Sequence, residues 1–457
     1  MVTGVQTCAL PIFIFDSQTI HNEKLFGSDQ DVQYTDTIGE FTEMSVQAPT
    51  VGFFPTVMNL LNSLVGSEIL SIPNSFSFCG LIISVSLMTL LAFLSYIATV
   101  MIVRLQFRTH TESLNDMARK LLGKWGSLAL SIITLLFTYS CCVAYLIIGG
   151  DNIRSWFSLI HIEGWMKGSK RMLVMLIYAL ILPVALTLPK KMGFLSMFST
   201  FSIFCLIVFV VVLIWKCSVL LSTNGINPTA KTFDMNLHFF NALAIYSLMF
   251  ALPAIVLPIV KHANPRIKAR YRIIGTSFFT CFLFVLIPGV MGYLTFGAHT
   301  DDIILNNFPN VDIVIQIVRV SFFIVVTASY PVIALSISSD LSALIFKVFD
   351  PVQLPFKKRV IILLITNIPP VFIAMVCPSI KPVLSIGGAL GGCLTNYLFP
   401  SLLWIKNSSH NMRYFKNIFC IFLAAFGLIS ATIATYQAFV VARSEERRVG
   451  KECRSRW

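Results

Sequence analysis

Long apolar runs separated by short polar loops make up most of the chain after residue 50. A bilayer core of about 30 Å needs roughly 20 apolar residues in a helix that rises about 1.5 Å per residue. The runs are continuous rather than alternating, which excludes a membrane β-barrel. The pattern therefore predicts an all-α polytopic membrane protein with eleven transmembrane helices, at 52–75, 80–103, 126–148, 171–189, 194–216, 238–260, 273–296, 313–345, 359–377, 381–405 and 415–441.

Composition indicates that lipid is the solvent of this chain. Hydrophobic residues make up 56% of it and charged residues only 12%, whereas about a quarter of the residues of a soluble domain are charged. The formal net charge of +13 would suit nucleic-acid binding only if the basic residues shared a polar surface. They lie instead in short loops between apolar runs, so we expect a lipid bilayer as the partner and no nucleic acid.

The basic residues also predict the orientation of the chain. Positive loop residues stay in the cytoplasm, and one alternate set of loops holds most of them, whereas the opposite set contains the acidic segment 299–302. We therefore expect a cytoplasmic N-terminus and a C-terminus on the other side. The positive set consists of Arg104, Arg108, Arg119, Lys120, Lys124, Lys190, Lys191, Lys261, Arg266, Lys268, Arg270, Arg272, Lys347, Lys357, Lys358, Arg359, Lys406, Arg413 and Lys416.

Both ends of the chain differ in character from the rest. Residues 1–13 and 444–457 resemble translated sequencing-adaptor sequence, so we exclude them from reasoning about the fold. Residues 14–50 are polar and mostly acidic, which is typical of a disordered cytoplasmic tail rather than a domain. The transmembrane domain is then 51–442.

Two of the predicted helices contain residues that interrupt a helix in mid-membrane. The first contains Gly66 and ends near Pro73, and the sixth contains Pro253 and Pro258. Pro removes a backbone donor and clashes with the preceding turn, and Gly lowers helix stability. We therefore predict a break in each of these helices.

The two broken helices also divide the chain into halves of similar length. Residues 52–221 and 238–405 each open with one of them and each contain five helices, so the second half enters the membrane in the opposite sense. Inverted repeats are typical of secondary transporters, in which broken helices flank a binding site near the bilayer midplane. The sequence thus predicts a five-plus-five inverted repeat, with helix 11 at 415–441 outside it.

An unwound segment can hold an amino acid without charged side chains. Half-helix N-termini present free N–H groups to a carboxylate, and carbonyls of the other half accept from an ammonium group or coordinate a cation. Gly66 and Ser67 permit close approach to the backbone of the first break, and Phe250 and Ala251 lie in the second. Glu68 is charged at membrane depth, so it is a candidate to bind ammonium, coordinate a cation or carry a proton. It could instead bond to free N–H groups of the break.

Two further helices supply polar candidates. Thr327 and Ser329 in the eighth helix carry hydroxyl groups that suit a hard cation such as Na⁺, although such hydroxyls usually bond to their own helix. Tyr139 and Tyr145 in the third helix could reach a substrate, or simply pack as aromatic residues.

Four segments in chain order resemble the amino acid/auxin permease family, which includes the sodium-coupled neutral amino acid transporters and the vacuolar amino acid transporters. The resemblance extends over about 50–442. The segments are NSLVGSEILSIP (62–73), VAYLIIGGD (143–151), GYLTFG (292–297), and GGALG (387–391) followed by LFPSL (398–402).

The resemblance implies eleven helices in the five-plus-five fold of the amino acid–polyamine–organocation superfamily. In sodium-coupled members an Asn in helix 1 and a Thr in helix 8 help to bind the ion. Asn62 matches the first position, Thr327 or Ser329 lies near the second, and we assign Val65 in the break to the same Na⁺ site. The chain departs from the family's usual Gly-Ser-Gly because the second Gly is Glu68, and this carboxylate could favour H⁺ coupling or a cationic substrate.

These observations predict a secondary active transporter of amino acids, neutral ones foremost, coupled to Na⁺ or H⁺ in the plasma membrane or a vacuolar or lysosomal membrane. The alternative is an amino-acid-binding nutrient sensor on the same fold. The sequence contains no phosphate-binding loop, which disfavours a pump, and no recognisable selectivity filter, which disfavours a channel. It also contains no cluster of reactive groups of the kind that an enzyme needs. We expect a monomer without a cofactor, with Na⁺ as the candidate coupling ion.

Overall fold

A computed structural model of the chain describes residues 52–166, 168–188, 195–261, 263–348, 351–377, 379–409, 411 and 413–454. Every regular element within these residues is a helix, which confirms the predicted all-α class for that part of the chain. The segments 1–13 and 14–50, which we assigned to adaptor sequence and an acidic tail, lie outside the described residues. The last helix continues to Arg454, into the segment that we assigned to adaptor sequence at the other end.

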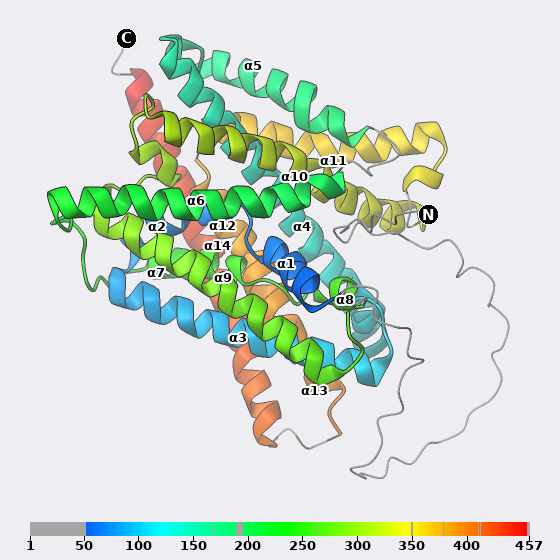
Figure 1. Ribbon diagram of the computed structural model, residues 1–457. Helices are drawn as coiled ribbons and strands as arrows, with labels where there is room; N and C mark the ends of the chain where they lie inside the picture. Colours follow the sequence, from blue (N-terminus) through cyan, green and yellow to red (C-terminus); the bar gives the residue numbers. More distant parts are fainter. Residues whose placement is uncertain are drawn as a thin grey trace, which may run out of the picture.

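Within the described residues, eight helices are long and apolar enough to cross a membrane by length and composition. Figure 1 shows how the helices are arranged. Each of the eight overlaps one of the predicted ranges. They are α3 (Leu81–Thr109), α4 (Leu114–Leu159), α5 (Gly168–Ala179) with its continuation through η4 (Leu180–Val184) and η5 (Ala185–Thr187), α6 (Leu195–Asn224), α9 (Ile267–Phe296), α10 (Ile313–Phe346), α11 (Phe356–Val376) and α14 (Phe415–Arg454).

The other three predicted ranges are divided into shorter elements. The first contains α1 (Phe53–Leu64), η1 (Ser67–Ser71) and α2 (Ile72–Ser75), and η2 (Phe76–Phe78) follows directly after it. The sixth contains α7 (Phe239–Met249) and α8 (Val256–Val260), and the tenth contains α12 (Lys381–Gly387), the π-helix η9 (Gly388–Leu398) and α13 (Phe399–Lys406). Short connecting turns complete the described chain: η3 (Glu163–Met166), η6 (Gly297–His299), η7 (Ile304–Asn307) and η8 (Pro351–Gln353).

Helix α4 is much longer than the predicted range 126–148. Its N-terminus is capped by Ser113, whose side chain accepts a hydrogen bond from the backbone N–H of Asp116 at 3.0 Å. Gly123, with a φ of 76°, kinks the helix about two and a half turns later. The predicted range 126–148 begins shortly after this kink, so its start agrees with the second helical stretch, whereas the helix continues past the predicted end to Leu159.

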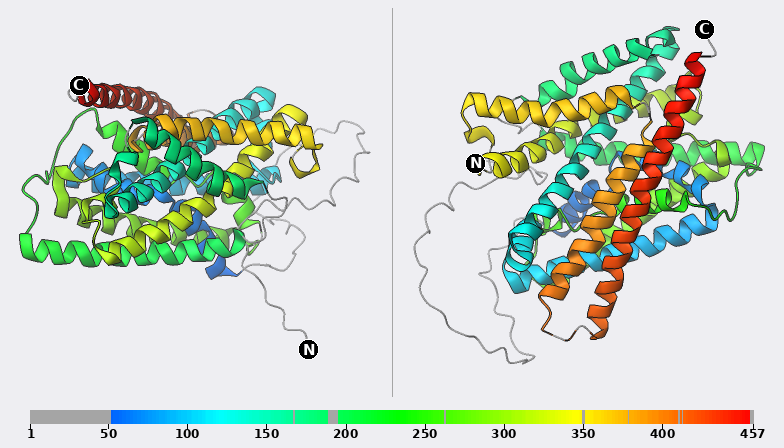
Figure 2. Two further views of the ribbon diagram at one scale, coloured as in Figure 1. Left: turned by 90° about the horizontal axis from the view of Figure 1, so that it is seen from above. Right: turned by 180° about the vertical axis from the view of Figure 1, so that it is seen from behind.

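The interrupted segments lie inside the bundle. Helix α7 packs against η9, α3 and α14, while α4 packs against α10, α11, α12 and η9. Figure 2 shows α14 running beside α13 on one side of the molecule, in agreement with the contacts between these two helices. The longer helices thus form a frame, and the divided segments in its interior position the candidate site.

Candidate functional site

The first helix is broken two residues before Glu68. Helix α1 ends at Leu64, and the N–H of Val65 makes the last helical bond, to the carbonyl of Leu61 at 2.8 Å. Val65 and Gly66 are extended, with φ and ψ of −92° and 97° and of −96° and −159°. The helix resumes as η1 at Ser67. Such a break exposes peptide N–H and C=O groups that an unbroken helix would pair internally.

The sixth predicted helix is broken as well. Helix α7 ends at Met249, and the chain follows irregular turns until α8 begins at Val256. Within the gap, the N–H of Ala251 bonds to the carbonyl of Leu248 and that of Leu252 to the carbonyl of Phe250, both at 3.0 Å. Pro253 cannot donate to a helix, which explains the position of this gap.

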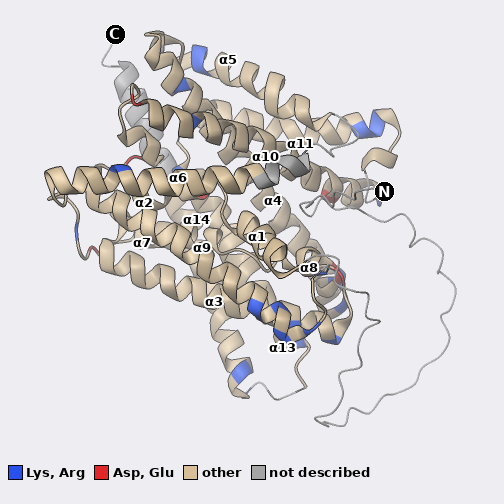
Figure 3. Ribbon diagram, viewed as in Figure 1, with Lys and Arg blue, Asp and Glu red and all other residues tan. Residues whose placement is uncertain are grey.

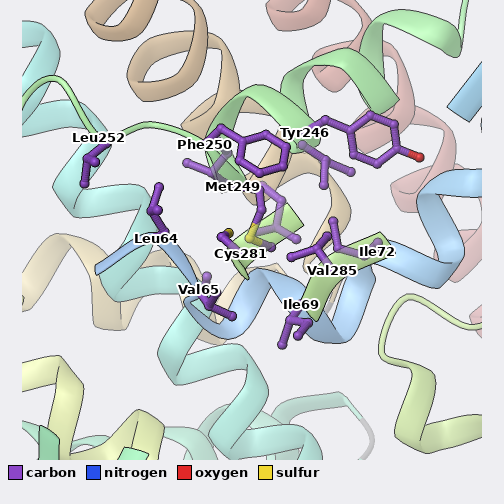
Figure 4. Packing of buried hydrophobic residues seen from close by; sticks show 14 of the residues in the cluster. Leu64, Val65, Ile69, Ile72, Tyr246, Met249, Phe250, Leu252, Cys281 and Val285 are labelled. Atoms are coloured by element: carbon purple, nitrogen blue, oxygen red, sulfur yellow. The ribbon is translucent and has the colours of Figure 1, made fainter. Parts of the chain in front are cut away.

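The two breaks lie side by side. Helix α8 contacts α1, and α7 contacts both η1 and α2. Figure 4 shows Leu64 and Val65 from the first break in one cluster with Phe250 and Leu252 from the second. The breaks predicted from the sequence are therefore present and adjacent.

Glu68 is buried at this junction, with 9% of its surface exposed. Its side chain folds back over the first break, so closely that a Cβ atom added to Gly66 would overlap its Oε2 atom. The carboxylate is also within electrostatic reach of Cys141 and Tyr145 on α4 and of Cys281 on α9. None of the salt bridges formed between described residues involves Glu68. The structure thus places beside the breaks a buried carboxylate that accepts a hydrogen bond from its own backbone N–H.

The other predicted substrate residues surround the same junction. Ser67 begins η1, and Tyr145 is half-buried on α4 within reach of Glu68. Phe250 is fully buried and stacks on Phe278 of α9, with ring centroids 6.2 Å apart.

The second break also has polar contacts to the tenth predicted helix. The amide of Asn396 in η9 donates to the Phe250 carbonyl at 3.4 Å, and Ala251 next to it is half-buried. Tyr139 is engaged elsewhere, since its hydroxyl donates to the carbonyl of Ile365 on α11 at 2.8 Å. Of the two tyrosines on α4, only Tyr145 is therefore directed toward the breaks.

The residues predicted to hold Na⁺ are oxygen donors on two helices. Asn62 is half-buried on α1, one turn before the extended residue Val65. On α10, the Thr327 hydroxyl lies 3.2 Å from the Tyr178 hydroxyl of α5, and Ser329 is half-buried nearby. Amide, carbonyl and hydroxyl oxygens are the ligands that hard cations prefer, so each of these residues is of a type that suits Na⁺. The described residues contain no group of three or more His, Cys, Asp or Glu side chains that could hold another metal.

The loop between α9 and α10, residues 297–312, covers one end of the broken first helix. The Ser71 hydroxyl donates to the carbonyl of Asp302 at 2.6 Å, and the Asn74 amide donates to the carbonyl of Thr300. From α12, Lys381 pairs with the Asp302 carboxylate at 2.6 Å. The loop is thus attached to both the first and the tenth predicted helices.

A buried arginine attaches the other side of the same loop. Arg319 of α10 is 1% exposed and donates to the carbonyl of Leu305 at 2.9 Å and to the side-chain oxygen of Asn306 at 2.7 Å. It also pairs with Asp151 of α4 at 3.5 Å, and the Asn306 amide donates to Asp151 at 3.1 Å. The sequence analysis missed this network, although a charged residue inside the apolar run of α10 was a signal that could have indicated it.

Comparison with known proteins identifies the family. A model for the transmembrane amino acid transporter proteins matches residues 49–440. The chain is 26% identical over 402 residues to sodium-coupled neutral amino acid transporter 7 of Danio rerio, covering 83% of this chain and 84% of that protein. It is 27% identical over 381 residues to amino acid transporter AVT6E of Arabidopsis thaliana, covering 78% and 76% of the two.

The fold has solved counterparts too. Mhp1, a nucleobase-cation-symport-1 family transporter, in a closed conformation with bromovinylhydantoin bound, is similar with a TM-score of 0.54. That similarity covers 88% of this chain and 94% of the other at 13% identity, so it bears on the fold alone. The matching sequence model, the two relatives and the interrupted-helix architecture agree. The chain belongs to the transmembrane amino acid transporter family and is an integral membrane protein.

Proposed function

We propose that this protein is a secondary active transporter that moves a neutral amino acid across a membrane by alternating access, in symport with Na⁺ or H⁺. The observation that carries the proposal is the adjacency of two mid-bundle helix breaks, at Val65–Gly66 and at Phe250–Ile255. The names of both relatives support an amino acid as substrate, and that of the Danio rerio protein supports a neutral one.

Peptide groups of the two breaks would hold the zwitterion. The carboxylate of an amino acid needs N–H donors, which the start of η1 supplies, and its ammonium group needs acceptors, which the carbonyls at the end of α7 supply. Removing these charges from water costs free energy unless hydrogen-bond partners in the protein replace the water. Gly66, Ser67, Glu68, Tyr145, Phe250 and Ala251 form the substrate site in this proposal.

Two coupling ions fit the same junction. Na⁺ would be held by oxygens of Asn62, Val65, Thr327 and Ser329, and the names of sodium-coupled relatives support that ion. H⁺ would instead be carried by Glu68, the buried carboxylate at the break. The gradient that drives uptake distinguishes the two.

The proposal includes the topology that the sequence predicts. The three divided segments also cross the membrane, giving eleven spans, and the halves 52–221 and 238–405 are inverted repeats. The N-terminus is cytoplasmic, and the protein lies in the plasma membrane or in a vacuolar or lysosomal membrane. The interrupted elements that open both halves support this arrangement.

Alternating access requires a barrier on each side of the site in turn. The contacts of the 297–312 loop with Ser71, Lys381 and Arg319 close one end. We propose that these contacts break when the site opens toward that side. The partly exposed Lys381–Asp302 pair is the weakest of the charged links and would break first.

Uptake by proteoliposomes tests the proposal. The purified protein is reconstituted and supplied with a panel of labelled amino acids under an inward Na⁺ gradient or an inward H⁺ gradient, applied separately. We expect concentrative uptake of neutral amino acids with one of the two gradients. Uptake that only equilibrates, or binding without uptake, would contradict secondary active transport.

A further inference from the structure

Two arginines of α3 share one tryptophan of α13. The guanidinium carbon of Arg104 lies 5.9 Å from the centroid of the Trp404 ring, and that of Arg108 lies 5.8 Å from it. Helices α3 and α13 pack against each other, so the three side chains belong to one surface at the C-terminal ends of both helices. Both arginines are exposed there.

No carboxylate balances these two charges within the part of the chain that the structure describes. The five salt bridges between described residues involve other cations. Arg104 and Arg108 are four residues apart on one helix face, where like charges repel. The rule that basic residues collect at one end of a membrane protein explains their presence. It does not explain why two guanidinium groups are held on one indole.

The neighbouring residues extend the positive surface. Tyr271, in the second turn of α9, is within electrostatic reach of both Arg104 and Arg108. Arg272 beside it and Lys406 at the end of α13 are exposed. Figure 3 shows Lys and Arg positions gathered around α13, with few acidic positions among them. The surface therefore combines several cations with an indole and a phenol at the end of a membrane bundle.

From this arrangement we infer that Arg104, Arg108 and Trp404 form a binding site for a membrane phospholipid with a phosphomonoester headgroup. A phosphomonoester carries a charge of about −1.5 to −2 at neutral pH, which matches two guanidinium groups. Guanidinium groups also bind phosphate oxygens in a bidentate manner. Indole rings favour the membrane interface, so Trp404 is suited to contact the lipid below its headgroup.

The site is independent of the proposed transport site. It uses none of the residues at the helix breaks, and it would bind lipid whether or not the protein moves an amino acid. Its effect would be to anchor α3 and α13 to a particular lipid at one face of the membrane.

Native mass spectrometry of the purified chain in detergent tests the inference, with short-chain phosphatidylinositol 4-phosphate as the probe. Each basic residue near an anionic surface contributes about a fivefold factor in affinity, so R104Q/R108Q should bind roughly thirtyfold more weakly. The matched control K357Q/K358Q removes the same charge from exposed residues at the start of α11 and should bind like the unmodified protein. R104K/R108K keeps the positive charges but loses the planar guanidinium groups, so its affinity for the probe should lie between those of R104Q/R108Q and the unmodified protein.

Three results would overturn the inference. The first is unchanged binding by R104Q/R108Q, and the second is an equal loss in both glutamine double variants, which indicates unspecific attraction. The third is full displacement of the probe by inorganic phosphate, which would identify a site for free phosphate instead. An intermediate affinity of R104K/R108K with normal binding by K357Q/K358Q supports a built lipid site. An unchanged size-exclusion profile of R104Q/R108Q shows that its weaker binding is not caused by misfolding.

Discussion

The carboxylate of Glu68 folds over the backbone of Gly66, so closely that a methyl group on Gly66 would overlap Oε2 of Glu68. Glu68, which departs from the family pattern, therefore packs directly against Gly66. The extended backbone of Gly66 is open to other residue types, since its φ of −96° is ordinary. A side chain at this position would therefore displace the Glu68 carboxylate, while the backbone itself could remain as it is.

This contact predicts the effect of Gly66→Ala. The added methyl group would push the Glu68 side chain out of the break, and we expect uptake to fall by at least about tenfold, as misplacement in a binding site commonly causes. The double variant Gly66→Ala/Glu68→Gly removes the overlapping atoms and should recover the fold and surface expression. Uptake assays and size-exclusion profiles of both variants measure this.

Gly275→Ala is the matched control. Gly275 lies in α9, where the nearest atom to an added Cβ is 3.6 Å away, so the substitution should leave uptake unchanged. Equal activity of Gly66→Ala and Gly275→Ala would show that the approach of Glu68 to Gly66 has no functional importance.

Glu68→Gln separates charge from shape. Gln has nearly the same volume but does not titrate, so we expect uptake by this variant to lose its dependence on pH. Uptake rates measured over a series of pH values test this, with Glu68→Asp as the carboxylate-retaining control. If pH dependence and affinity stay the same, Glu68 only fills the break.

The Lys381–Asp302 pair predicts the mobility of the loop 297–312. Both side chains are partly exposed, at 28% and 29%, so the pair contributes about 0.2–1 kcal/mol, or up to about fivefold in the equilibrium between closed and open loop. Lys381→Ala should raise the hydrogen-exchange rate of the loop amides by up to about that factor. The charge-reversed variant Asp302→Lys/Lys381→Asp should restore slow exchange.

Lys261→Ala provides the comparison for that experiment. Lys261, at the end of α8, pairs with Glu112 at 3.1 Å, and neither residue belongs to the loop 297–312. Its loss should leave exchange of that loop unchanged. Faster exchange in both alanine variants would mean that the Lys381–Asp302 pair does not act as a specific link.

Asp312 at the start of α10 predicts a pH-dependent stability. It accepts from the backbone N–H of Val314 and Ile315 and pairs with Lys216 of α6. The hydrogen bond from Lys216, followed by those backbone contacts, lowers the pKa of Asp312, while burial opposes the shift. Because the pKa is lower in the folded state, this stabilisation is present above the usual value of about 3.9 and is lost as pH falls through the folded pKa.

Thermal unfolding in detergent measures this contribution. Asp312→Ala removes the cap and the ion pair, and we expect it to lower the free energy of unfolding by about 1–2 kcal/mol at neutral pH. Asp312→Asn retains a side chain that can cap the helix and loses only the ion pair, so its free energy of unfolding should fall by less than that of Asp312→Ala. Equal losses in the two variants would contradict a capping role.

The sequence indicated the breaks correctly because their cause is local. Gly66 and Pro253 weaken a helix wherever they occur in it, so their effect can be predicted without knowing what packs nearby. The family could be recognised for the same reason, since its motifs are short and contiguous.

The features that could not be predicted from the sequence depend on contacts between segments that are distant in the chain. The change of the tenth predicted helix to the π-helix η9 accompanies a close approach to α7, where a Cβ on Gly388 would overlap the carbonyl oxygen of Ala244. The links of Arg319 to Asp151 and of Lys381 to Asp302 likewise join residues more than 75 positions apart. No local pattern encodes such pairs.

Electron cryomicroscopy of the protein with a transported neutral amino acid bound tests most directly whether the adjacent breaks hold the substrate. We predict density for the amino acid between 65–67 and 250–252, with its carboxylate toward the start of η1 and its ammonium group toward the end of α7. Density at any other position in the bundle, or an unbroken helix through either break in the bound protein, would contradict the proposed mode of binding.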